Sequence, residues 1–374
     1  MAGIYIHIPF CKTACSYCDF HFSTRLTEIS RMERAIEKEL ILRINEVGNE
    51  SIQTLYFGGG TPSLMRPEFL ADVILNVFGQ LPDSNSTEIT LEVNPDDVTP
   101  KIAADWMAAG VNRVSLGVQS FDDALLQWMK RPHNAQRAID AIHELKRSGF
   151  SNITMDLIYG IPEMSMELWH KQIEIFLSLH LSHLSAYCLT AEQRTLYGNQ
   201  VEKGLALAVN QDAASDQYLM LVNQLAAAGI HQYEVSNFSL PGLESKHNSA
   251  YWSGVTYIGI GPSAHSFNGQ TRRWNVANNH AYMRAIEKNL PYSEGEVLTP
   301  QNIINEKLLM GLRTVKGIDL KILESEHGWS PDNAASNRMK RLCSEGKAFW
   351  VNNVFRLSAE GLLMADAIAR DMFV

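Results

Sequence analysis

Residues 11–18 read Cys11-Lys12-Thr13-Ala14-Cys15-Ser16-Tyr17-Cys18 and hold three of the five cysteines of the chain. Three thiolates this close together can converge on one metal centre, whereas structural zinc and electron-transfer clusters normally take four protein ligands. A four-iron, four-sulfur cluster bound by three cysteines keeps one iron open for a substrate or a cofactor. The alternative is zinc, because His21 would complete a ligand set with Cys11, Cys15 and Cys18.

The composition excludes several classes of protein. With 374 residues, 45% of them hydrophobic, the chain can form two domains or one large barrel with an appendage. A formal net charge of -9 provides no uniformly basic surface, so we expect no nucleic-acid partner. No stretch approaches the roughly 20 apolar residues of a membrane span, and the clustered cysteines suit a reducing compartment, so we expect a cytoplasmic location. Cys188 and Cys343 are isolated and are expected to be inert.

From residue 4 to about residue 190, short apolar or β-branched runs alternate with longer segments of helical period. This alternation is typical of βα units around parallel strands. The expected strands are 4–8, 53–57, 88–93, 113–116, 153–158 and 183–188, and the expected helices include 29–44, 103–109, 135–148 and 167–179. Six units fit, fewer than the eight that close a full barrel.

The unusual residues of this region fall at the ends of the expected strands. Gly58-Gly59-Gly60-Thr61 follows the second strand, Glu92 ends the third, Gln119 follows the fourth and Asp156 lies near the end of the fifth. In βα barrels the loops after the strands meet on one face and carry the functional groups. Each motif alone is weak: triple glycine is common in turns, and Lys130-Arg131-Pro132-His133 is also typical of a solvated basic turn.

Together, the cysteine spacing and the order of these motifs resemble the radical S-adenosylmethionine (SAM) superfamily. Within it, the chain is similar to the oxygen-independent coproporphyrinogen III oxidase group from residue 5 to the C-terminus. The resemblance implies an α/β fold, a partial (β/α)6 TIM-like radical SAM barrel, with a 4Fe-4S cluster on Cys11, Cys15 and Cys18. It also implies a SAM site, whose residues map to Tyr5, Tyr17, Gly59, Gly60, Thr61, Glu92, Gln119, Arg131 and Asp156.

A second motif, Lys246-His247-Asn248-Ser249-Ala250-Tyr251-Trp252, matches the His-Asn-x-x-Tyr-Trp pattern of the heme chaperone branch of this group. The match implies that His247 ligates heme iron beside two aromatic side chains. His265 is a further candidate. The alternative is that His247 is a hydrogen-bonded loop histidine and that the aromatic residues anchor the core. Phe20 stands where the oxidases carry a further cysteine, and their N-terminal extension has no counterpart before the first strand, which favours the chaperone branch.

Beyond residue 290 the pattern changes. Helices are expected at 300–310, 319–324, 336–345 and 359–371, with a hairpin formed by 348–351 and 354–357. This order resembles a C-terminal α+β winged-helix-like domain. The expected domains are a radical SAM partial barrel at 1–200, a barrel extension that carries the second motif at 201–290, and the winged-helix-like domain at 291–374.

The resemblance predicts a heme chaperone that binds heme, the cluster and SAM, and transfers heme to acceptor proteins such as respiratory hemoproteins. Peripheral contact with membrane proteins and a homodimer are left open. The alternative function is that of an oxygen-independent coproporphyrinogen III oxidase, which decarboxylates coproporphyrinogen III to protoporphyrinogen IX. The sequence leaves undecided whether the chain is an enzyme.

Overall fold

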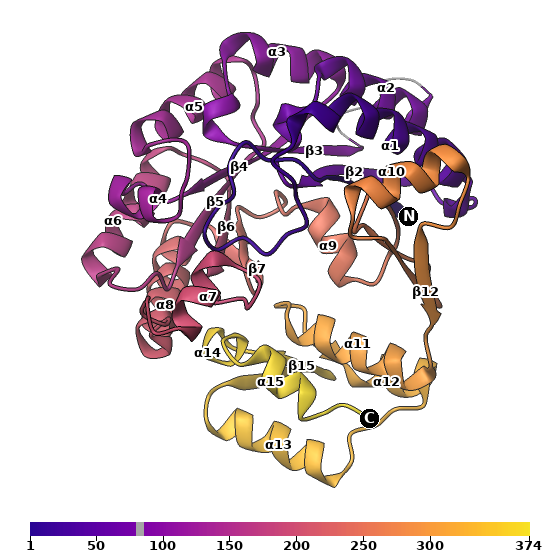
Figure 1. Cartoon of the computed structure of the whole chain (residues 1–374). Helices are drawn as coiled ribbons and strands as arrows, with labels where there is room; N and C mark the ends of the chain where they lie inside the picture. Colours follow the sequence, from indigo (N-terminus) through magenta and orange to yellow (C-terminus); the bar gives the residue numbers. More distant parts are fainter. Residues whose placement is uncertain (80–85) are drawn as a thin grey trace.

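The computed structural model describes residues 1–79 and 86–374. In these residues the main sheet has twelve strands, in the order β12-β11-β10-β9-β1-β2-β3-β4-β5-β6-β8-β7. The six predicted strands are confirmed as its centre, where they are parallel and in chain order (Figure 1). They are β1 (Ala2–Ile8), β2 (Ile52–Gly59), β3 (Glu88–Val93), β4 (Arg113–Gln119), β5 (Ile153–Tyr159) and β6 (His183–Cys188).

Helices cover the outer face of these strands, as Figure 1 shows for the indigo to magenta part of the chain. They are α1 (Ile29–Arg43), α2 (Pro67–Phe78), α3 (Pro100–Ala109), α4 (Asp123–Trp128), α5 (Ala135–Arg147) and α6 (Met166–Ser178). Side-chain oxygens cap several of them; Asn134, for example, accepts a hydrogen bond from the third N–H of α5. Gly110 and Gly149 each adopt a φ of +106°, which ends a helix before the next strand, as predicted.

Successive side chains of a strand point to opposite faces of the sheet, and only those on the inner face can form a site. In β1, Ile4, Ile6 and Ile8 are fully buried among the core residues. Because neighbouring side chains of a strand point to opposite faces, Tyr5 and His7 lie on the inner, concave face. Short 3-10 helices at Leu26–Glu28, Ile44–Val47, Pro62–Leu64 and Pro95–Asp97 complete the loops of this part of the chain.

The segment after β6 extends the sheet at both edges. β8 pairs antiparallel with β6, and β9 pairs parallel with β1. The elements are α7 (Leu196–Glu202), α8 (Gln211–Ala227), β7 (His231–Glu234), β8 (Asn237–Ser239), α9 (Lys246–Trp252), β9 (Thr256–Ile260), β10 (His265–Phe267), β11 (Thr271–Asn275), α10 (Asn279–Lys288) and β12 (Ser293–Val297). β12 pairs with β11, so the sheet continues past residue 290.

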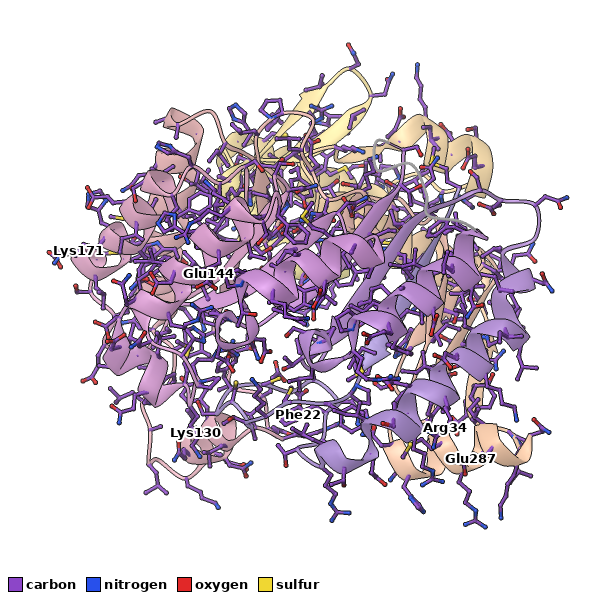
Figure 2. The ribbon with its side chains drawn as sticks, turned by 90° about the horizontal axis from the view of Figure 1, so that it is seen from above. Phe22, Arg34, Lys130, Glu144, Lys171 and Glu287 are labelled. Carbon is purple, nitrogen blue, oxygen red and sulfur yellow. The ribbon has the colours of Figure 1, made fainter. Side chains whose placement is uncertain are left out.

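Two contacts fix this extension. Helix α10 packs against α1, where Arg31 binds Glu287 with N–O distances of 2.6 and 2.7 Å. Figure 2 shows Arg34 of α1 and Glu287 of α10 close together at the outer rim of the molecule. Helix α9 packs against β2, on the inner side of the sheet.

The C-terminal part, yellow and orange in Figure 1, forms a separate group below the sheet. It consists of α11 (Pro300–Leu312), β13 (Ile318–Asp319), α12 (Leu320–His327), α13 (Asn333–Ser344), β14 (Ala348–Val351), β15 (Val354–Leu357), α14 (Ala359–Leu362) and α15 (Ala365–Arg370). The predicted hairpin is confirmed, and Asn352 at its turn has a φ of +56°. The prediction of one helix over 359–371 is wrong. The chain bends at Met364, because α14 packs on β15 and α8 whereas α15 packs on α11.

Across the two described ranges, no helix combines the length and the apolar character that crossing a membrane requires.

Candidate functional site

A cavity of about 520 Å³ lies where the central strands end; we call it the cysteine cavity. Its lining includes the predicted cluster ligands and every predicted SAM residue except Tyr5. These residues are Cys11, Cys15, Cys18, Tyr17, Gly59, Gly60, Thr61, Glu92, Gln119, Arg131 and Asp156. Residues from position 11 to position 156 thus meet at one face of the sheet, as the strand-end argument predicts.

All five cysteines are free thiols, and each is half-buried. Burial raises the pKa of Cys11 and of Cys18 to about 11. The guanidinium of Arg131 lies beside Cys15, the remaining cysteine of the predicted cluster ligands, with Nη1 3.4 Å from Cys15 Sγ. Cys188 lines the same cavity, whereas Cys343 lies far along the chain on α13.

Arg131 is not part of a solvated turn, because its side chain is half-buried and most of its donors are used inside the protein. Nη2 donates hydrogen bonds to Asn94 Oδ1, at 2.6 Å, and to the carbonyl of Gly117, at 2.8 Å. Its Nε is buried and has no hydrogen-bond partner among the described residues. A half-buried cation beside the thiols fits a cluster whose sulfur ligands carry negative charge.

The cysteine loop is anchored at both ends. Lys12 forms ion pairs with Asp96, at 3.0 Å, and with Asp97, which follow β3. The N–H of Ser16 donates to the carbonyl of Met129, and its own carbonyl accepts from Tyr197 N–H at 2.8 Å. The loop is therefore held by three other parts of the fold.

The glycine motif packs tightly under this loop. Gly59 N–H donates to Glu92 Oε2, at 2.9 Å, and Gly60 N–H donates to the carbonyl of Ile8, at 2.8 Å. A Cβ atom on Gly60 would lie 2.6 Å from the carbonyl oxygen of Phe10, so only glycine fits there. Both N–H groups already donate hydrogen bonds within the protein, so they are not free to bind a ligand. The absence of side chains would instead let a ligand come close to the backbone.

Two buried carboxylates and one strained residue complete the cavity. Burial raises the pKa of Glu92 to about 7 and that of Asp156 to about 6. Tyr56 donates to Glu92 Oε1, at 2.8 Å, and Ser115 donates to Asp156. Gln119 has a φ of +69° at an irregular position of β4, a backbone conformation that non-glycine residues adopt uncommonly.

The zinc alternative depended on His21, which lies outside the lining of the cysteine cavity. Its Nε2 is 2.7 Å from Asn279 Oδ1 on α10. In the part of the chain that the structure describes, no three His, Cys, Asp or Glu side chains are grouped around a common point that one metal ion could occupy.

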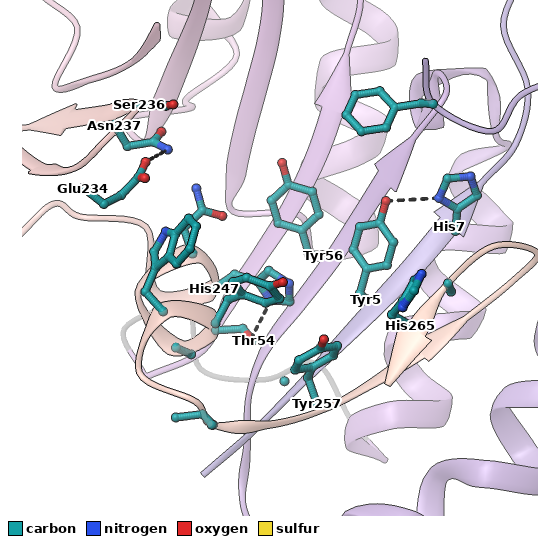
Figure 3. A pocket seen from close by; sticks show the side chains of 18 of the residues that line it. Tyr5, His7, Thr54, Tyr56, Glu234, Ser236, Asn237, His247, Tyr257 and His265 are labelled. Carbon is teal, nitrogen blue, oxygen red and sulfur yellow. Dashed lines mark hydrogen bonds between the residues drawn. The ribbon is translucent and has the colours of Figure 1, made fainter. Parts of the chain in front are cut away.

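A second cavity of about 860 Å³ adjoins the first; we call it the histidine cavity. Asp19, Phe20 and Tyr187 line both. The second motif and the inner faces of β1 and β2 contribute the residues in Figure 3, among them Tyr5, Thr54, Tyr56 and His247. His265, the further candidate, also lines this cavity.

His247 lies in the first turn of α9, so the predicted loop alternative is wrong about its backbone. Its Nδ1 is 2.9 Å from Thr54 Oγ1, and its ring stacks on Tyr56 with centroids 4.9 Å apart (Figure 3). Glu88 receives the N–H groups of Lys246, at 2.9 Å, and of His247, at 3.0 Å, which fixes the start of the helix. Burial lowers the pKa of His247 to about 4, so the ring is neutral at pH 7.

Tyr5 faces the histidine cavity, not the cysteine cavity. Nε2 of His7 lies 2.9 Å from the carbonyl of His21, so this nitrogen carries the proton and donates. Nδ1 of His7 is then an acceptor, and Tyr5 O–H, at 3.2 Å, donates to it. The role of Tyr5 as a SAM contact stays a prediction, as do the roles of the other site residues.

Sequence reasoning missed several residues of the two cavities. Thr54 and Tyr56 alternate with the buried Leu55 and Phe57, and this period of two could have placed them on the inner face. No comparable signal pointed to Glu88, which begins its strand far from α9 in the sequence.

The fold and the cysteine cavity define a radical SAM protein, and a model of the radical SAM superfamily matches residues 5–172. The chain is 34% identical to the heme chaperone HemW of Bacillus subtilis, over 98% of both chains. It is 35% identical to HemW of Lactococcus lactis, over 91% of this chain and 89% of that one. It is 32% identical to the mitochondrial radical S-adenosyl methionine domain-containing protein 1 of Bos taurus, over 98% and 86%.

Among solved structures, coproporphyrinogen III oxidase (HemN) from Escherichia coli, a radical SAM enzyme, matches with a TM-score of 0.84. The match covers 100% of this chain and 90% of that one at 19% identity, and therefore shows a shared fold. On the full-length relationships, the chain belongs to the HemW family of the radical SAM superfamily. Members of this superfamily take a 4Fe-4S cluster and SAM, and the thiols and the half-buried cation of the cysteine cavity fit these groups.

Proposed function

We propose that the chain is a heme chaperone of the HemW type, which binds heme, a 4Fe-4S cluster and SAM, and transfers heme to acceptor proteins. The observation that carries this proposal is the relationship to HemW of Bacillus subtilis, at 34% identity over 98% of both chains. The position of the histidine cavity beside the cysteine cavity supports it further.

His247 is the residue that we propose as the heme ligand. It is neutral at pH 7, and in the tautomer in which Nδ1–H donates to Thr54 Oγ1 the lone pair of Nε2 is left for a metal. The described residues supply no hydrogen-bond partner for Nε2. The cavity volume of about 860 Å³ lies within the range of roughly 300–1,000 Å³ that is typical of cofactor sites.

The cysteine cavity would hold the other two groups. Cys11, Cys15 and Cys18 would bind the cluster, and Arg131 would stabilise the thiolate of Cys15. With SAM, the cluster supplies one-electron chemistry when bound. Glu92 and Asp156 are placed to accept hydrogen bonds from hydroxyl groups, although each is already partly paired.

We also propose the cellular context. The clustered cysteines fit the reducing cytoplasm, and respiratory hemoproteins are the acceptors we expect. A peripheral contact with membrane proteins would bring the chaperone to such acceptors, and a homodimer is compatible with this role.

The second candidate is a coproporphyrinogen III oxidase, which the shared fold with HemN favours. Phe20 argues against the oxidase function, because the oxidases have a cysteine at this position. The side chain of Phe20 is 71% exposed and lines both cavities.

Anaerobic reconstitution with iron and sulfide, followed by a heme titration, tests the proposal. The titration compares wild type, His247→Ala and Cys15→Ser by visible absorption, with iron and sulfide counted separately. We expect His247→Ala to weaken heme binding at least tenfold and to keep the cluster, because only the axial ligand is lost. Cys15→Ser should lose cluster iron and still bind heme.

Unchanged heme affinity and spectrum in His247→Ala would contradict the ligand assignment. A wild type that carries a cluster, does not bind heme, and forms protoporphyrinogen IX from coproporphyrinogen III would establish the oxidase instead.

A further inference from the structure

Two arginines of the histidine cavity have no role in the function proposed above. Arg272 lies on β11 and Arg313 follows the last residue of α11. They are the only permanently cationic side chains in the described lining, which otherwise carries histidines, tyrosines, Asp19 and Glu234. Arginine binds carboxylates through paired N–H groups in a fixed plane, so such a pair in a cavity suggests an anionic ligand.

Each guanidinium is held from outside the cavity by one carboxylate. Arg272 Nη2 lies 2.9 Å from Glu306 Oε1, and Arg313 binds Asp366 through Nε and Nη2, at 2.7 and 2.9 Å. Neither Glu306, on α11, nor Asp366, on α15, lines the cavity. The described residues supply no partner for Nη1 of either arginine, so donors remain for a ligand.

Aromatic rings support both guanidinium groups. Cζ of Arg313 lies 5.5 Å from the ring centroid of Trp252, and Cζ of Arg272 lies 5.9 Å from that of Phe267. Each arginine is therefore oriented before a ligand arrives, which lowers the entropy that binding costs. Trp252 belongs to the same short helix as His247.

Helix α11 sets the spacing of the two arginines, because Arg272 binds Glu306 of this helix and Arg313 follows its last residue. Glu306, which holds Arg272, lies on α11 seven residues before Arg313, the residue that caps the C-terminus of this helix, so their backbones are about 10 Å apart along the helix axis. Two carboxylates on short flexible arms of one molecule can reach such a pair. Glu234 also lines the cavity, but its carboxylate accepts a hydrogen bond from Asn237 (Figure 3).

We propose that Arg272 and Arg313 bind the two propionate carboxylates of heme, while His247 approaches the iron. This inference rests on the proposed function and deepens it: the ligand is selected as a dicarboxylate as well as a metalloporphyrin. The arginines give heme one orientation in the cavity and discriminate against porphyrins whose acid groups are masked.

The test compares hemin with hemin dimethyl ester, in which both propionates are neutral. Both ligands are titrated into the reconstituted full-length protein, and the ratio of the two dissociation constants is measured. We expect wild type to bind hemin at least tenfold more tightly than the ester. Arg272→Gln and Arg313→Gln should each reduce this preference several-fold, the double variant should abolish it, and the affinity for the ester should stay unchanged.

Three matched variants separate recognition from folding. Arg273→Gln alters the next residue of β11, which pairs with Glu46 and does not line the cavity, and should keep the preference. Glu306→Gln and Asp366→Asn break the same ion pairs as the arginine variants but leave the arginines in place, and should also keep it.

Equal affinity of wild type for hemin and its ester would overturn this inference and leave the proposed function standing. The inference would also be overturned if Glu306→Gln and Asp366→Asn lost as much of the preference for hemin over its ester as the arginine variants do. Failure of wild type to bind either ligand would instead overturn the proposed function.

Discussion

One hydroxyl group and one stacked ring position the imidazole of His247. Thr54 Oγ1 lies 2.9 Å from Nδ1, and Tyr56 stacks at 4.9 Å between centroids. A histidine that ligates a metal through one nitrogen usually donates the other N–H to a neighbour, which fixes the tautomer and the ring orientation. In the proposed heme site Thr54 is therefore a positioning residue, whose effect would reach the iron only through His247.

Thr54→Val removes the hydroxyl and nearly conserves the shape of the side chain. We expect heme affinity to fall roughly 10-fold, the lower end for loss of a supporting hydrogen bond to a metal ligand, because both tautomers of His247 then become populated. Thr54→Ser should restore the affinity. The measurement is a heme titration of both variants together with the position of the Soret band.

A Thr54→Val protein with wild-type affinity and Soret band would contradict the positioning role. A loss in Thr54→Val that Thr54→Ser does not restore would indicate a packing defect instead, because Thr54 is buried and its side chain occupies the space where a Cβ atom of Gly3 would lie.

At the scale of elements, helix α9 depends on a residue of the barrel. Glu88 begins β3, and its carboxylate accepts hydrogen bonds from Ser245 Oγ, Lys246 N–H and His247 N–H. A negative charge at a helix N-terminus satisfies free N–H groups and opposes the helix dipole. Seven residues are too few for a stable isolated helix, so this contact and packing on β2 keep α9 formed.

Glu88→Gln should loosen α9 and leave the sheet intact. We expect the free energy of unfolding to fall by more than the roughly 1–2 kcal/mol of a lost cap, because the variant also leaves the buried Arg113 without its charge partner, and amide hydrogen exchange over 245–252 to become faster. Glu68→Gln, an exposed acidic residue in the first turn of α2, is the matched control. Exchange over 245–252 as slow as in wild type would show that packing alone holds the helix.

At the scale of the whole molecule, the two cavities share a wall. Asp19 and Phe20 directly follow Cys18 in the chain, and with Tyr187 they line both cavities. In the proposed cluster site, ligation of Cys18 would order Asp19 and Phe20, which also line the histidine cavity. Ordering a segment in advance reduces the entropy that the second ligand loses on binding.

The reconstituted protein should therefore bind heme more tightly than the cluster-free protein, by about 5-fold or more, the size of a typical coupling between sites. The measurement is the dissociation constant of heme with and without the cluster. Phe20→Ala should reduce the ratio by removing the shared side chain. Identical constants for the two forms would show that the cavities act independently.

Much of this architecture could be predicted from the sequence, because it depends on local patterns. The six central strands follow from apolar runs separated by helical segments, and glycines mark where helices end. The face that carries Cys11, Glu92 and Asp156 follows from the rule that βα loops meet at the strand ends. The final helix was predicted wrongly, because packing of α14 and α15 on different neighbours outweighs local helix preference.

The sequence by itself determined the fold class, and it supplied the cysteine ligand set and the His247 motif as predictions, since each depends on the spacing of residues close in the chain. Tertiary structure alone decided that Arg131 is half-buried beside Cys15, that Tyr5 faces the histidine cavity, and that Arg272 and Arg313 line this cavity together with His247. The physical reason is that these arrangements join distant segments: Arg131 and Cys15 are 116 residues apart, and Tyr5 and His247 are 242 residues apart. Sheet pairing and helix packing bring such segments together, and no local pattern records those distances.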